Sequence, residues 1–161
     1  TDLSEYIIKP ALGEDPGILG ALQLGIEALS NGAEFCYFCD NDNVSFNLTK
    51  KNIEKSGFND KSAVYLSDSH LFLKRISNKN KFDCIFMDPP FGNDILYKCL
   101  KFIGNNDCLT DSGFVVVETS SDNILSDHYG KISLEKQHTY GYVSIYIYKI
   151  ASDTFESIDN R

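Results

Sequence analysis

Short apolar runs alternate with helical patterns along most of this chain. Apolar side chains recur at helical spacing in four segments, residues 18–30, 44–56, 69–76 and 94–103. Between them lie apolar runs typical of strands, residues 6–12, 34–39, 63–66, 82–87 and 113–118. Two further strand-like runs, 131–137 and 143–149, close the pattern with no helical segment between them. The pattern predicts strand–helix repeats followed by a strand pair.

This order predicts the fold class. Strand–helix alternation implies right-handed crossovers and therefore an α/β domain with a mostly parallel, twisted sheet and helices on both faces. The closing pair predicts an antiparallel edge strand. The length of 161 residues fits a single domain over residues 1–150, followed by a polar tail over 151–161. Ligands bind beyond the carboxyl ends of the strands in such sheets, so the residues that follow each strand are the candidates for function.

The charge balance narrows the possible partners. The net charge of −8 argues against non-specific binding to free nucleic acid, which requires a basic surface. More than half of the basic residues nevertheless fall within residues 50–81, where they form either a solvated helix face or a patch that faces phosphates. They are Lys50, Lys51, Lys55, Lys61, Lys74, Arg75, Lys79 and Lys81.

The cysteines indicate the compartment. Five cysteines in a chain without a signal peptide predict a reducing, cytoplasmic environment and no disulfides. Cys36 and Cys39 lie three apart in an expected strand and so point to opposite faces, which excludes a shared metal. The most apolar stretch, residues 18–29, is too short to cross a bilayer. We expect a monomer without membrane contact. The first residue, Thr1, indicates that an N-terminal segment has been removed or omitted.

Acidic residues follow the second and third expected strands. Asp40 stands where such folds commonly hold the ribose hydroxyls of a nucleoside cofactor. Asp42 or Asn43 can cap the helix that follows, which is compatible with ribose binding by Asp40. Asp68 either hydrogen-bonds an adenine edge or only caps the next helix. The candidate cofactor residues here are Asp40, Asn41, Asp68 and Ser69.

The fourth strand ends in Asp88-Pro89-Pro90-Phe91. Proline fixes φ and restricts the preceding residue, so Asp88 and Pro89 are held extended. The two prolines lack N–H groups, which leaves nearby carbonyls able to accept hydrogen bonds from a ligand. A carboxylate, a fixed carbonyl and an aromatic ring together suit a planar base that carries an amino group, and catalysis would then act through orientation. The alternative is a turn that merely ends the strand.

These residues resemble a known family. The Asp-Pro-Pro-Phe stretch matches the (D/N)PP(Y/F) motif of class I S-adenosylmethionine-dependent methyltransferases that modify exocyclic amines. More narrowly, the chain resembles the RsmD family, which methylates a guanine N2 of small-subunit ribosomal RNA in bacteria. The matching stretches extend over roughly residues 20–149: residues 24–33, Asp40-x-Asp42 with Asn52, residues 82–91 and Tyr140-Gly141.

The resemblance implies a Rossmann-like class I methyltransferase fold, S-adenosylmethionine as cofactor, and ribosomal RNA or the small ribosomal subunit as partner through the basic residues of 50–81. No metal is expected, because the sequence has no second Cys-x-x-Cys and its three histidines do not cluster. It implies that Asp88 and the Pro89 carbonyl hold the substrate amino group, that Pro90 fixes the turn and that Phe91 stacks on the target base. It also implies that Asp40 holds the cofactor ribose and Asp68 contacts the adenine.

One segment departs from the family. Where its first loop is rich in glycine, this chain has Gly20-Ala21-Leu22, with Leu22 in place of an expected second glycine. Residues 9–25 instead resemble the C-terminal strand–loop–helix of ROK-family sugar kinases. We expect Gly13, Gly17 and Gly20 to form the cofactor loop. The hypotheses are thus an RNA methyltransferase, a methyltransferase-like binding module with an impaired cofactor loop, or a DNA adenine-N6 methyltransferase.

Overall fold

The computed structural model of the chain describes residues 5–8, 16–90 and 94–151, with side chains from residue 21 onward. Its helices are α1 (Pro16–Ser30), α2 (Asn43–Ser56), the 3-10 helix η1 (Asn59–Lys61), α3 (Ser69–Ile76) and α4 (Ile95–Asn105). Its strands are β1 (Glu5–Ile8), β2 (Phe35–Asp40), β3 (Ser62–Leu66), β4 (Phe82–Met87), β5 (Leu109–Ser120), β6 (His128–Tyr129), β7 (Ile132–Tyr140) and β8 (Val143–Ile150).

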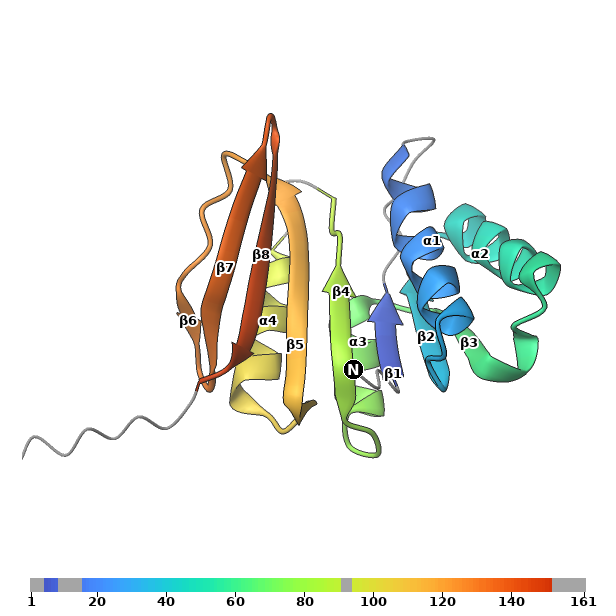
Figure 1. Ribbon diagram of the computed structural model, residues 1–161, viewed down its shortest axis with the longest axis horizontal. Helices are drawn as coiled ribbons and strands as arrows, with labels where there is room; N and C mark the ends of the chain where they lie inside the picture. Colours follow the sequence, from blue (N-terminus) through green and yellow to red (C-terminus); the bar gives the residue numbers. More distant parts are fainter. Residues whose placement is uncertain (1–4, 9–15, 91–93, 152–161) are drawn as a thin grey trace, which may run out of the picture.

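The strands form one sheet in the order β3-β2-β1-β4-β5-β8-β7-β6, which can be followed in Figure 1. The ladders that join β1 to β2 and β4, β2 to β3, and β4 to β5 are parallel. Strand β8 pairs antiparallel with both β5 and β7. The structure therefore confirms the predicted α/β fold with a parallel centre and an antiparallel edge.

Each face of the sheet carries its own apolar core. Helices α1 and α2 contact each other over one face, where Leu22, Leu29 and Ile53 are buried. Helices α3 and α4 contact each other over the other face, around Phe72 and Leu100. The central strand β4 lies between these layers and all six of its residues are buried. Burial on both faces explains why this strand reads as an almost unbroken apolar run.

Two cysteines confirm the strand geometry predicted from the sequence. Cys36 and Cys39 are both buried in β2, but Cys36 belongs to the core under α1 and α2 and Cys39 to the core under α3 and α4. Side chains three apart in a strand point to opposite faces, and this pair does so.

Strand β5 corrects one expectation. The turn expected at residues 111–113 is a bulge inside a longer strand, because Phe82 pairs with Leu109 whereas Cys84 pairs with Phe114. A Cβ atom on Gly113 would lie 2.6 Å from the carbonyl oxygen of Phe82, so the bulge needs glycine at this position. The hydroxyl of Thr110 donates to the buried Asp83 carboxylate at 2.9 Å, which satisfies a polar group inside the apolar run.

Helix α1 corrects another expectation. It begins at Pro16, so Gly17 and Gly20 lie in its first turns and not in a loop. Proline is favoured at the first helical position because its missing N–H has no partner there in any case. The structure also ends β1 at Ile8, whereas the sequence predicts a strand up to residue 12; residues 9–12 lie outside the described residues.

Candidate active site

The candidate site lies along the edge of the sheet where the parallel strands end. The carboxyl ends of β2, β3 and β4 meet at this edge, which is the upper edge in Figure 1. Strand β2 ends at Asp40, β3 is followed by Ser67 and Asp68, and β4 is followed by Asp88. Residues from three separate strands are thus brought to one edge, as the sequence predicts.

Asp40 is fixed by its neighbours at the end of β2. Its side chain is 1% exposed, and Oδ1 accepts a hydrogen bond from the Asp42 N–H at 2.8 Å. Its carbonyl accepts from the Ser67 N–H at 2.8 Å, and the Cys39 thiol donates to the Ser67 carbonyl at 3.3 Å. These bonds join the ends of β2 and β3, so the Asp40 carboxylate has a defined position.

The capping roles left open by the sequence are visible in the structure. The Asp42 carboxylate accepts from the N–H and the hydroxyl of Ser45, at 2.9 and 3.1 Å, and caps α2. The Oδ1 atom of Asp68 accepts from the N–H groups of His70 and Leu71, both at 3.0 Å, and caps α3. Both aspartates therefore satisfy helix N-termini, and adenine recognition by Asp68 stays a prediction.

The proline segment after β4 faces the first turns of α3 and α4. Pro89 is buried, whereas Asp88 and Pro90 are half-buried. Pro89 borders an apolar cavity of about 20 Å³, which is also lined by Ser69 and Ile95. A cavity of that size holds at most one water molecule. Phe91, expected to stack on the target base, lies outside the described residues.

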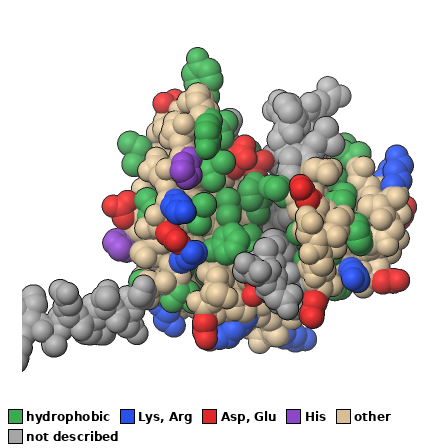
Figure 2. Space-filling model, viewed as in Figure 1, with side chains coloured by type: hydrophobic (Ala, Val, Ile, Leu, Met, Phe, Trp, Pro, Cys, Tyr) green, Lys and Arg blue, Asp and Glu red, His purple; other side chains and the backbone are tan. Residues whose placement is uncertain are grey.

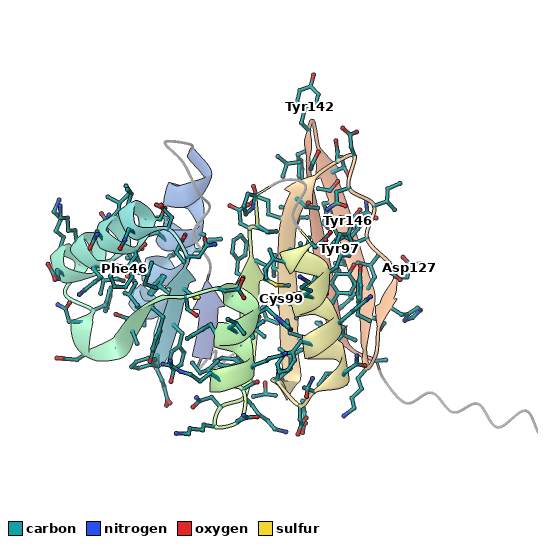
Figure 3. The ribbon with its side chains drawn as sticks, turned by 180° about the vertical axis from the view of Figure 1, so that it is seen from behind. Phe46, Tyr97, Cys99, Asp127, Tyr142 and Tyr146 are labelled. Atoms are coloured by element: carbon teal, nitrogen blue, oxygen red, sulfur yellow. The ribbon has the colours of Figure 1, made fainter. Side chains whose placement is uncertain are left out.

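A polar network borders the site and is not apparent from the sequence. The hydroxyl of Tyr97 in α4 donates to Oδ1 of Asn123 at 2.6 Å, and the Asn123 amide donates to the Thr119 hydroxyl at 2.9 Å. The Tyr146 hydroxyl donates to the Asn123 carbonyl at 3.3 Å. Figure 3 shows Tyr97 and Tyr146 close together beside α4. This network ties the segment after β5 to α4 and β8; its members are too far apart in sequence to form a motif.

The expected glycine loop differs from the observed structure. Gly13 lies outside the described residues, and Gly17 and Gly20 are helical. Leu22, the departure from the family pattern, is 3% exposed and packs in the core under α1 and α2. Leu22 is therefore a core residue of helix α1 and does not take the place of a loop glycine.

The basic residues of 50–81 do not form one patch beside this edge. Those of α2 lie over one face of the sheet, and Lys74 and Arg75 lie in the last turn of α3 on the other face. The Nζ atom of Lys81 pairs with the Asp107 carboxylate at 2.7 Å, and the Arg75 guanidinium lies 5.4 Å from the centre of the Tyr65 ring. Helices that run back along the sheet carry their basic last turns away from the carboxyl edge, so the sequence cluster is dispersed in space.

Carboxylates dominate the edge itself. Asp40 ends β2, Asp68 and Asp88 follow β3 and β4, and half-buried Glu118 lies in β5. Burial and then Lys74 lower the pKa of His70, the residue that follows Ser69, with a smaller opposing effect of Asp68. This imidazole is therefore neutral near neutral pH. A row of carboxylates attracts a compact cation such as a sulfonium or ammonium group.

Within the described residues, the helices are too short or too polar to span a membrane.

Comparison with known proteins agrees with this geometry. The family model described as Conserved hypothetical protein 95 matches residues 18–149. The candidate rRNA methyltransferase YlbH of Bacillus subtilis is 32% identical over 131 residues, which cover 81% of this chain and 71% of that protein. The ribosomal RNA small subunit methyltransferase D of Haemophilus influenzae is 32% identical over 136 residues, which cover 83% of this chain and 69% of that protein.

A solved structure is also similar over nearly the whole chain. The crystal structure of a candidate methylase from Haemophilus influenzae has a TM-score of 0.76 and 28% identity, and the match covers 93% of this chain and 88% of that chain. The matching family model and these relatives confirm the resemblance to the RsmD family and the class I methyltransferase fold. The chain therefore belongs to the family described as Conserved hypothetical protein 95.

Proposed function

We propose that this chain methylates the N2 amino group of a guanine in small-subunit ribosomal RNA, with S-adenosylmethionine as methyl donor. Its family relationship makes it a methyltransferase of RNA that depends on this cofactor. The position of Asp88-Pro89-Pro90 directly after the fully buried strand β4 carries the proposal. The relative named ribosomal RNA small subunit methyltransferase D supports the choice of RNA.

The described residues fit the proposed cofactor. When bound, S-adenosylmethionine supplies an electrophilic methyl group on a positively charged sulfur. The carboxylates at the ends of β2, β3 and β4 favour that charge. Asp40 would accept hydrogen bonds from the ribose hydroxyls, with Asn41 beside it. The adenine would lie across the mouth of the small cavity at Ser69 and Pro89, near Asp68, because the cavity is too small to enclose a purine.

The residues after β4 would orient the base. The Asp88 carboxylate and the Pro89 carbonyl are hydrogen-bond acceptors, so they would take the two N–H groups of the amine and leave its lone pair directed at the methyl carbon. Pro90 would hold the turn by its fixed φ. Phe91 would stack on the base, which must leave its helix to reach this edge. Alignment and exclusion of water would then provide most of the rate enhancement, without a strong general base. As the nitrogen gains the methyl group, the bond from that methyl carbon to sulfur would break and S-adenosylhomocysteine would leave. The amino group would lose one N–H proton, by way of the Asp88 carboxylate or directly to solvent.

The substitution Asp88→Ala tests this assignment. We expect methyl transfer to small ribosomal subunits to be abolished, because the amine loses the acceptor that orients it. Affinity for S-adenosylhomocysteine, measured by titration calorimetry, should stay close to that of the wild type. Asp94→Ala is the matched control, since Asp94 is exposed and its side chain makes no capping hydrogen bond. A collapse of cofactor affinity in Asp88→Ala would show that Asp88 holds the cofactor and not the substrate.

Product analysis tests the choice of base. Transfer of labelled methyl groups, followed by nucleoside digestion and mass spectrometry, should yield N2-methylguanosine. N6-methyladenosine in DNA would instead support the DNA adenine alternative. The binding-module alternative predicts no heat with S-adenosylmethionine at millimolar concentration. The binding-module alternative depends on Leu22 having replaced a loop glycine, but Leu22 packs as a core residue.

A further inference from the structure

The turn between β7 and β8 projects two tyrosines from the sheet. Tyr140 pairs with Val143 across a two-residue turn made of Gly141 and Tyr142. Gly141 has a φ of 59°, and among the described residues no other residue type has a positive φ. Glycine in the first central position is the signature of a type II′ turn, whose twist matches that of a hairpin. The tip, which we define as Lys136, His138, Tyr140 and Tyr142, is therefore a regular element and not a loose loop.

The aromatic rings of the tip contribute little to the fold. Tyr140 is 67% exposed and Tyr142 is 89% exposed. Figure 3 shows Tyr142 at the summit of the hairpin, directed away from the rest of the molecule, and hydrophobic side chains reach the same summit in Figure 2. The rings of His138 and Tyr140 stack with centres 6.3 Å apart and planes 23° apart. Exposed, clustered aromatic rings are typical of contact surfaces.

The tip stands beside the candidate active site. Met87, just before Asp88, is level with Val117 of β5, and β5 continues for three residues to Ser120, which pairs with Val143. Three residues of strand correspond to about 10 Å along the sheet, and two strand spacings between β4 and β8 correspond to about 10 Å across it. Tyr140 and Tyr142 thus lie beyond the same edge as Asp88, at a distance that a short segment of RNA can bridge.

The charge of the hairpin differs from that of the edge. Residues 136–148 contain no Asp or Glu, whereas the chain as a whole carries a net charge of −8. Glu135, just before the tip, is paired with Lys149, whose Nζ lies 2.7 Å from Glu135 Oε2. Lys136 adds a basic side chain to the hairpin below its turn, because its partner Ile147 pairs with Val116, which is level with Phe86. An acidic site edge repels phosphates, so a neutral to basic aromatic element is the part of this edge best suited to touch RNA.

We propose that the tip is a second RNA contact, in which Tyr142 and Tyr140 stack on unpaired bases next to the target nucleotide. The inference rests on the proposed function, because it assumes that RNA reaches the carboxyl edge. Stacking on aromatic rings suits single-stranded bases of any sequence. The tip would hold the flanking strand while the target base enters the site at Asp88.

Steady-state methyl transfer to small ribosomal subunits tests the proposal. In the double variant Tyr140→Ala/Tyr142→Ala, KM for the subunit should rise at least tenfold, as expected from the loss of one or two base stacks. The value of kcat and the affinity for S-adenosylhomocysteine should change less than twofold. Tyr140→Phe/Tyr142→Phe keeps both rings and should behave like the wild type. Ile150→Ala, which removes an exposed side chain at the opposite end of β8, should also leave KM unchanged.

The outcomes separate the two proposals. A wild-type protein that transfers no methyl group would overturn the proposed function. An active wild type with an unchanged KM in the double alanine variant would overturn only the role of the tip. Photocrosslinking from p-benzoylphenylalanine at position 142 to small subunits identifies the partner. Crosslinks to RNA support the proposal, and crosslinks solely to ribosomal proteins would show that the tip binds protein and overturn it.

Discussion

Asp40 is held in place by hydrogen bonds at the candidate cofactor site. It is buried at the end of β2 and its Oδ1 atom already accepts the Asp42 N–H, so its carboxylate is oriented before any ligand arrives. Asp40→Asn keeps the Oδ1 acceptor but removes the charge. We expect the affinity for S-adenosylhomocysteine to fall by about tenfold, because a hydrogen bond to a charged acceptor is worth roughly 1.5–3 kcal/mol and one to a neutral acceptor roughly 0.5–1.5 kcal/mol. Titration calorimetry measures this change.

The neighbouring Asp42 provides the control for this substitution. Asp42→Asn makes the same chemical change at the cap of α2, where asparagine is an equally good cap. Its cofactor affinity should match that of the wild type. Equal losses in the two variants would mean that both act through the structure of the β2–α2 turn, and ribose recognition by Asp40 would then be wrong.

At the scale of elements, α4 depends on close contact with the antiparallel edge. A Cβ atom on Gly104 would overlap the backbone carbonyl of Tyr129 in β6, and the Gly104 carbonyl accepts from the Lys131 N–H at 2.7 Å. We expect Gly104→Ala to lower the free energy of unfolding by about 3 kcal/mol or more, since the clash involves backbone on both sides. Urea denaturation followed by circular dichroism measures this loss.

The substitution Gly57→Ala distinguishes the cost of a positive φ from the cost of a steric clash. It ends α2 with a φ of 77°, and a Cβ atom there would meet nothing within 4 Å. Gly57→Ala should therefore cost only about 1–2 kcal/mol, the strain of a left-handed residue with a side chain. If both alanine variants lost the same small amount, α4 and β6 would not be in tight contact.

At the scale of the whole molecule, the distribution of charge governs how RNA can be bound. The net charge is −8, and the basic residues of 50–81 are divided between two faces of the sheet. We expect only about two phosphate contacts, so KM for small subunits should rise less than about tenfold between 50 and 200 mM salt. Initial rates over a salt series measure this dependence. A thousandfold rise would instead indicate six or more phosphate contacts and an extended basic surface.

The sequence predicts well those features that are encoded locally. The apolar run of β4, the helical period of α2 and the aspartates after β2 and β3 are read over a few neighbouring residues, and the structure confirms each position. The Asp-Pro-Pro segment falls directly after β4 for the same reason. The strand β6 is missed because it has only two residues, and two residues cannot display a period.

Features that depend on distant partners were not predictable. The bulge in β5 reads as a turn in sequence, because only its pairing with Phe82 and Cys84 shows that the strand continues. The hydrogen bonds that join Tyr97, Asn123 and Thr119 connect residues from different elements. The residues around Tyr142 form no recognisable motif. Its proposed role as an RNA contact follows from its position beyond the carboxyl edge of the sheet.

Periodicity and short motifs were enough to predict the order of all elements except the shortest ones, the family, and the residues that follow each parallel strand. The three-dimensional arrangement was needed to show which residues share the carboxyl edge, that Leu22 belongs to a core, that the basic residues are dispersed and that an aromatic hairpin rises beside Asp88. Strand pairing and helix packing fix distances between residues far apart in the chain, and no local pattern carries that information.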